Sequence, residues 1–117
     1  MASPDRAARD PSPDEALPSD LLVVLAALDD ATQVRLLLGD LLTPAELNSV
    51  RERWAIVKAL AAGGTHRAVR DRVGVSIATV SRGSRQLQHG SGGFALAFET
   101  LARLGLPSPV DEGGGRP

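Results

Sequence analysis

Apolar residues recur at helical spacing from about residue 19 to residue 104, and every segment of that stretch has the periodicity of a helix. The first two helices are predicted at residues 20–28, after Ser19 as the N-cap, and at residues 31–42. Both have a broad apolar face made mainly of leucine and valine. The pattern therefore predicts an all-α protein.

The next helix has clear signals at both ends. Thr43 is a typical N-cap residue, Pro44 suits the first helical position, and Glu46 stands three residues after the cap, as in a capping box. The helix is predicted to run to about residue 62, where two glycines end it. Its apolar positions form one stripe: Leu47, Val50, Trp54, Val57 and Ala61. The tryptophan is therefore predicted to lie in the core, not to contact a ligand.

Two short helices joined by a tight turn are predicted next. The first, His66–Val73, follows Thr65 and ends at Gly74, and the second, Ile77–Leu87, is capped by Ser76. The packing positions of such a pair would be Val69, Val73, Val75, Ile77, Val80 and Gly83. The exposed positions would be His66, Arg67, Arg70, Ala78, Thr79, Ser81, Arg82 and Arg85. This pattern predicts a helix-turn-helix at about residues 66–87, although an ordinary αα-corner has similar spacing.

Charge is distributed unevenly along the chain, although the formal net charge is only −1. Residues 1–50 carry a net charge of −6, whereas residues 51–89 hold eight basic side chains against two acidic ones, a net charge of +6. The basic segment contains the predicted helix-turn-helix. Contacts with the DNA backbone require such a concentration of cations, because binding releases counterions condensed on the phosphates. A solvated surface would be the alternative explanation.

Composition points to a single domain that needs a partner. With two Phe, one Trp and no Tyr in 117 residues, one chain has few large side chains to bury, which favours an obligate oligomer. Residues 1–18 and 107–117 are rich in Pro, Gly and charged residues, and we expect both to be disordered. The folded domain is therefore predicted at residues 19–106.

Several other classes of protein are disfavoured by the sequence. The chain has two histidines and no cysteine, and its acidic residues gather in the N-terminal third, so no catalytic pair or metal-ligand spacing appears. We expect neither an enzyme nor a metal site. No stretch has the length of a membrane span, and the N-terminus lacks a signal-peptide pattern, so a cytoplasmic protein is expected.

Specific residues give the chain a resemblance to the bacterial tryptophan repressor family. The matching stretches are Leu42-Thr43-Pro44, Arg53 with Ile56, Val57 and Leu60, and Gly74 to Ser84 followed by Leu87. The resemblance implies a six-helix subunit with a helix-turn-helix, in an intertwined homodimer that binds double-stranded operator DNA. It thus implies a transcriptional repressor controlled by a small aromatic corepressor, with L-tryptophan as the first candidate and no other cofactor.

The family's corepressor site carries over position by position. Arg53 and Arg82 match the arginines that flank the indole, Thr43 matches a wall residue, and Gly83 matches the glycine that leaves room for the ring. The remaining positions implied for the pocket are Asp40, Leu41, Leu42 and Gln86. Two of these depart from the best-known members, because Asp40 replaces an apolar residue and Gln86 replaces a serine that contacts the ligand.

DNA contacts are predicted on the two short helices. The first positions of the second helix, Ile77, Ala78 and Thr79, would read base edges, and Arg67 would reach a guanine. Phosphate or nearby contacts are assigned to Arg70, Ser81 and Arg85, and His66 is a further predicted DNA contact.

Three alternatives stay open at this point. A glycine-rich linker at residues 90–93 followed by Phe94 resembles a branch of related proteins whose ligand is unclear, so the chain would then sense another indole or aromatic acid, or no ligand. A helix-turn-helix accessory of a mobile element is the second alternative, but such proteins usually continue into a long heptad helix, and here the chain breaks at Gly90. A protein-interaction module would need an acidic partner for the basic segment.

Overall fold

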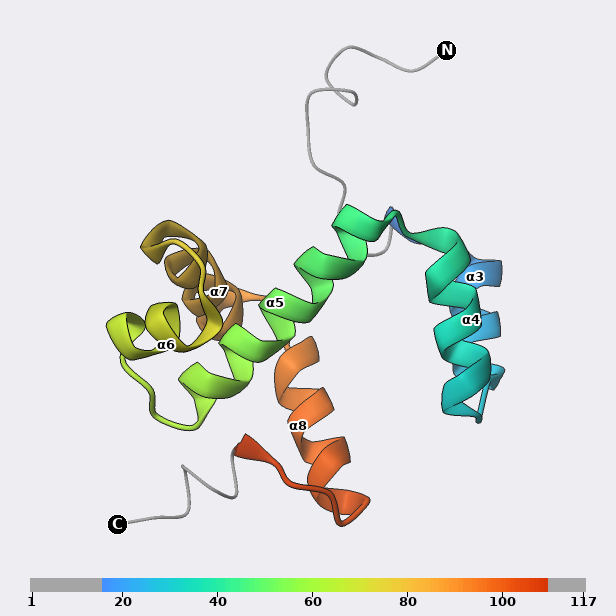
Figure 1. Cartoon of the computed structure of the whole chain (residues 1–117). Coiled ribbons are helices and arrows are strands. Elements are labelled where there is room, and N and C mark those ends of the chain that lie inside the picture. Colours follow the sequence, from blue (N-terminus) through green and yellow to red (C-terminus); the bar gives the residue numbers. More distant parts are fainter. Residues whose placement is uncertain (1–15, 110–117) are drawn as a thin grey trace. The chain divides into compact units, whose positions relative to one another are not determined.

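The computed structural model describes residues 16–109, which fall into two compact units, one ending at Thr43 and the other beginning at Pro44. All regular secondary structure in this range is helical, as predicted (Figure 1). The helices with defined bounds are α3 (Ser19–Ala27), α4 (Ala31–Leu41), α5 (Pro44–Ala61), α6 (His66–Val73), α7 (Ile77–His89) and α8 (Gly93–Arg103). No helix among these residues is long and apolar enough to cross a membrane.

The first unit contains α3 and α4. The prediction of Ser19 as an N-cap is wrong, because Ser19 is the first helical residue and Pro18 precedes it in extended conformation. The Pro18 carbonyl accepts a hydrogen bond from the Leu22 amide at 3.1 Å, so the helix starts one residue earlier than predicted. At the start of α4, Asp30 accepts from the Thr32 amide at 2.7 Å. No residue of either helix is buried.

The core of the second unit lies where α5, α6 and α7 meet. Ile56, Val69 and Val80 come from these three helices and are each at most 2% exposed. Partly buried residues pack around them: Ala59, Leu60, Val73 and Val75. The predicted packing face of the two short helices is thus confirmed at its central positions.

Helix α8 adds an aromatic cluster to the second unit. The Trp54 ring lies 5.6 Å from the ring of Phe98 and 6.4 Å from that of Phe94, measured between centroids. Phe98 is fully buried and Trp54 is partly buried. Trp54 therefore packs against aromatic side chains as predicted, but it is only partly buried.

The chain directly after α8 is packed against the second unit, although the sequence predicted disorder from residue 107. Ser108 and Pro109 are both buried, and the Ser108 hydroxyl donates to the Phe98 carbonyl at 3.0 Å. The expectation of a disordered segment from residue 107 is therefore wrong for these two residues. A proline-flanked serine has no local pattern that reveals such a contact, because its acceptor lies ten residues away. Residues 16–18 and 107 of the predicted disordered ends also lie within the described range, whereas residues 1–15 and 110–117 lie outside it.

Candidate nucleic-acid interface and ligand site

Three local signals build the turn between α6 and α7. The Thr65 hydroxyl accepts from the Ala68 amide at 3.1 Å and so caps the start of α6. Gly74 ends α6 with φ 81° and ψ 38°, a left-handed conformation that glycine adopts without steric cost. The Ser76 hydroxyl then accepts from the Thr79 amide at 3.1 Å at the start of α7. Both helix starts agree with the prediction, and α7 ends two residues later, at His89.

Gly83 sets how closely α7 approaches α5. A Cβ built at this position would lie 2.7 Å from the Cγ2 of Ile56, closer than real side chains allow. Any larger residue would therefore push α7 away from the helix that supports it. The predicted packing role of Gly83 is confirmed, while its role in leaving room for a ligand stays a prediction.

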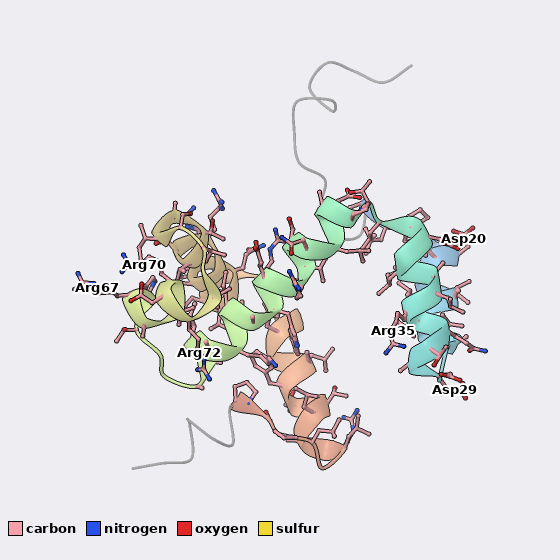
Figure 2. All side chains as sticks on the ribbon, in the orientation of Figure 1. Asp20, Asp29, Arg35, Arg67, Arg70 and Arg72 are labelled. Atoms are coloured by element: carbon pink, nitrogen blue, oxygen red, sulfur yellow. The ribbon has the colours of Figure 1, made fainter. Side chains whose placement is uncertain are left out.

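The residues predicted to contact DNA lie on the surface of α6 and the first part of α7. His66, Arg67, Ile77, Ala78, Ser81 and Arg85 are exposed, and Arg70 and Thr79 are partly buried. The side chains of Arg67 and Arg70 extend from α6 away from α5, whereas Arg72 lies toward α5 (Figure 2). Ile77, which the sequence suggested for packing as well as base reading, is 45% exposed.

A short hydrogen-bond network links the start of α7 to its middle. The Thr79 hydroxyl lies 2.8 Å from the Ser76 hydroxyl and accepts from the Arg82 guanidinium at 3.3 Å. Arg82 is therefore in contact with a residue predicted to read bases. A substitution of Arg82 would consequently disturb predicted DNA and ligand contacts together.

Arg70 is the one predicted DNA contact that is partly neutralised within its own helix. Its guanidinium lies 2.9 Å from the Asp71 carboxylate, and its Nε donates to the same oxygen at 3.0 Å. Both side chains are substantially exposed, so the pair contributes little to stability. It does lower the positive charge that α6 presents to a phosphate.

The predicted corepressor residues divide between the two units. Asp40 and Leu41 end α4, and Leu42 and Thr43 follow them, all in the first unit. Arg53 lies on α5, and Arg82, Gly83 and Gln86 lie on α7. Apart from the buried Gly83 and the partly buried Leu42, these side chains are exposed. Their assembly into one pocket stays a prediction.

Gln86 lines a hollow in the second unit. This space of about 440 Å³ is bordered by the Trp54 and Phe94 rings and by the glycine-rich stretch between α7 and α8. An aromatic wall beside an exposed amide suits a planar ligand with a polar group. Among the predicted corepressor residues, Gln86 therefore lies beside an aromatic surface.

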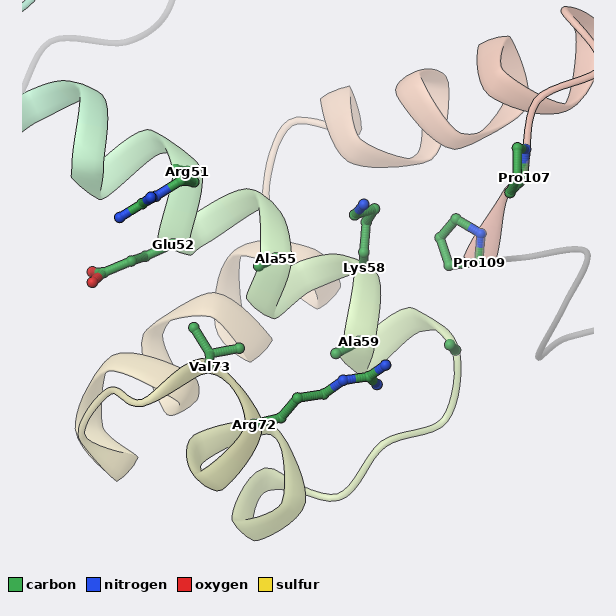
Figure 3. Close-up of a pocket in the computed structure, with 10 residues that line it drawn as sticks. Arg51, Glu52, Ala55, Lys58, Ala59, Arg72, Val73, Pro107 and Pro109 are labelled. Atoms are coloured by element: carbon green, nitrogen blue, oxygen red, sulfur yellow. The ribbon is translucent and has the colours of Figure 1, made fainter.

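A basic groove on the second unit was not predicted. Lys58 on α5 and Arg72 on α6 both line it, together with Arg51 (Figure 3). The sequence assigned all three to the basic segment but to no site. Arg72 is two residues after Arg70, about 200° around the helix, so helical phase was the signal that separated it from the predicted DNA face.

A family model described as Trp repressor protein matches residues 19–102. The chain belongs to the Trp repressor family. The match covers all of α3 to α7 and most of α8, so both units are part of it. No curated protein and no solved structure gave a significant match.

Membership of the Trp repressor family places the protein among DNA-binding transcription regulators. The prediction of a Trp repressor-like regulator is therefore confirmed. The corepressor, the dimer and the residues that contact DNA stay predictions.

Proposed function

We propose that this protein is a transcriptional repressor that binds operator DNA as a homodimer, with α6 and α7 as its helix-turn-helix. The observation that carries the proposal is the exposed, cation-rich surface of α6 and α7, which a shared core and a left-handed glycine turn hold in fixed geometry. Phosphate contacts need exposed cations, and base reading needs a helix held at a defined angle. Both requirements are met on the same pair of helices.

Base reading is assigned to the start of α7, with phosphate contacts around it. Ile77, Ala78 and Thr79 begin the helix that would enter the major groove, and Arg67 would reach a guanine edge. His66, Arg70, Ser81 and Arg85 would contact phosphates or lie near them. The Ser76–Thr79 hydroxyl contact gives Thr79 a defined orientation from which to donate or accept.

The corepressor in this proposal is a small aromatic carboxylic acid, with L-tryptophan as the first candidate. Arg53 is on α5, whereas Arg82 is on α7, so a ligand held by both would link the reading helix to the helix that supports it. A guanidinium can stack on an indole and pair with a carboxylate. Asp40 and Gln86, the departures from the family pattern, make another indole or aromatic acid the second candidate.

Operator reading is tested by selecting duplexes from a random pool with purified protein and measuring affinity by fluorescence anisotropy. Thr79→Ala should reduce the preference for the selected operator over a scrambled duplex by about tenfold, the effect of about 1.4 kcal/mol in base discrimination. Arg70→Ala should weaken binding to both duplexes equally and lower the slope of log K against log salt by about one. The assignment would be contradicted if Thr79→Ala, like Arg70→Ala, weakened binding to both duplexes equally.

Ligand control is tested by calorimetry with L-tryptophan and a panel of indoles and aromatic acids, followed by DNA titrations with and without the ligand that binds. Arg53→Ala should abolish the ligand's effect on operator affinity while weak, salt-sensitive DNA binding persists. Arg51→Ala is the matched control, because it removes the same charge two residues earlier on α5. An Arg53→Ala protein that responds fully to ligand would refute this role.

A further inference from the structure

A groove of about 680 Å³ lies on the second unit, between α5, α6 and the segment after α8 (Figure 3). Three cations line it: Arg51, Lys58 and Arg72. Glu52 is the one acidic residue in its lining, which gives the groove a formal net charge of +2. A volume of this size is in the range of small-molecule sites.

The cations of the groove are not neutralised by the described part of the chain. Within residues 16–109, none of the three makes an ion pair, in contrast to Arg70, which is paired with Asp71. Arg51 donates to the Asn48 amide oxygen, and the Lys58 ammonium lies 5.7 Å from the centroid of the Trp54 ring. Their positive charge is therefore available to an anion.

The shape of the groove is set before any ligand enters. Ala55 and Ala59 line its α5 side with small side chains, which leave room between the cations. Pro107 and Pro109 form the opposite wall. This wall is held in place because the intervening Ser108 is buried and bonded to the Phe98 carbonyl. A preformed site binds at a lower entropic cost than one that must be ordered.

The groove is separate from the predicted DNA face. Arg67 and Arg70 extend from α6 away from α5, whereas Arg72 lies toward it (Figure 2). On α5, Arg53 is about 200° around the helix from Arg51, so the predicted corepressor contact is not part of the groove lining either.

We infer that this groove is a second ligand site, one that binds a phosphate dianion, either free or as a small organic phosphate. A phosphate monoester carries close to two negative charges near neutral pH, which matches the net charge of the lining. Two guanidinium groups and one ammonium supply the donors that phosphate oxygens take. An occupant would join α5 to α6 and would bind while α6 faces DNA, so the site is independent of the proposed operator and corepressor.

The test is calorimetry of the full chain with phenyl phosphate and with inorganic phosphate, at constant ionic strength set by sodium chloride. Arg72→Gln should weaken phosphate binding about tenfold, the loss expected for one charge-assisted hydrogen bond. Lys58→Gln provides a second variant with the same expectation, and circular dichroism checks that each variant is folded. Tighter binding of phenyl phosphate than of inorganic phosphate would identify an organic phosphate as the ligand, and equal binding would identify the free ion.

The matched control is Arg67→Gln, which removes the same charge from the opposite side of α6 and should leave phosphate affinity unchanged within about twofold. Equal weakening in the Arg67 and Arg72 variants would overturn the site, since it would reveal a response to net charge alone. Displacement of phosphate by a saturating random-sequence duplex would also overturn it, because the groove would then belong to the DNA interface.

Discussion

The two units of the chain use apolar residues in opposite ways. The second unit buries Ile56, Val57, Val69, Val80 and Phe98 within a single chain. Helices α3 and α4 are rich in leucine and valine, yet none of their residues is buried, and Val23 and Leu36 are 67% and 66% exposed. Apolar composition alone therefore does not predict burial, because burial requires a further surface to pack against.

Geometry explains the difference. In the second unit, α5 packs against both α6 and α7, so three helices enclose a common core. Two helices alone have one shared face, and their remaining apolar residues stay in contact with water. A second copy of the chain would cover them, which is the physical basis for the homodimer in our proposal.

The largest effect is expected from breaking that inferred interface. Leu36→Glu should weaken the dimer at least about 100-fold, about 2.7 kcal/mol, because association would bury an unpaired carboxylate. Sedimentation equilibrium measures the dissociation constant. Gln88→Glu adds the same charge at an exposed position of α7, in the second unit, and should leave the dissociation constant unchanged. A monomeric wild-type protein at micromolar concentration would contradict the explanation that a second copy covers the apolar residues of α3 and α4.

Glycines sharpen the contrast between the units. Gly83→Ala should destabilise the protein by about 1–3 kcal/mol, because its Cβ would collide with Ile56 at the contact between α5 and α7. Gly39→Ala in α4 meets no atom within 4 Å in the chain and should be neutral or stabilise by up to about 1 kcal/mol. Urea denaturation gives both values. A Gly83→Ala protein as stable as wild type would show that the two helices separate at no cost.

Helix positions were predictable where a local signal marks them. The local signals are Pro44, Thr65, Gly74 and Ser76. Each acts through its own backbone or through an amide up to three residues away, so α5, α6 and α7 begin where predicted. The fold-back at Ser108 depends on a carbonyl ten residues away and was missed.

The candidate sites follow the same division. The exposed positions of α6 and α7 could be assigned from helical phase, because both helices have the predicted bounds at their start. The basic groove could not be predicted from helical phase, because Arg51 and Arg72 lie far apart in the sequence. They line the same groove only because α6 packs on α5. The corepressor residues came from family resemblance, since no spacing rule joins the end of α4 to α7.

A smaller effect is expected at the end of the second unit. Ser108→Ala should lower the free energy of unfolding by about 1 kcal/mol, the net contribution of one hydrogen bond. The variant loses the hydrogen bond that the Ser108 hydroxyl donates to the Phe98 carbonyl. Ser91→Ala, at an exposed serine between α7 and α8, is the control and should change stability by less than about 0.5 kcal/mol. Thermal unfolding compares the two variants, and equal stabilities would exclude a contribution of the fold-back.

The smallest effect is expected from the ion pair on α6. Asp71→Asn should leave stability nearly unchanged, because the Arg70–Asp71 pair is exposed and such pairs contribute at most about 1 kcal/mol. DNA affinity should nevertheless rise about two- to threefold at low salt, since Arg70 would no longer share its charge with a carboxylate and phosphates would meet less repulsion. Anisotropy titrations at two salt concentrations measure both the gain and its loss as salt increases. Glu99→Gln removes the same charge from α8 and should produce no such gain. An equal gain in both variants would mean that net charge, not the contact with Arg70, controls the affinity.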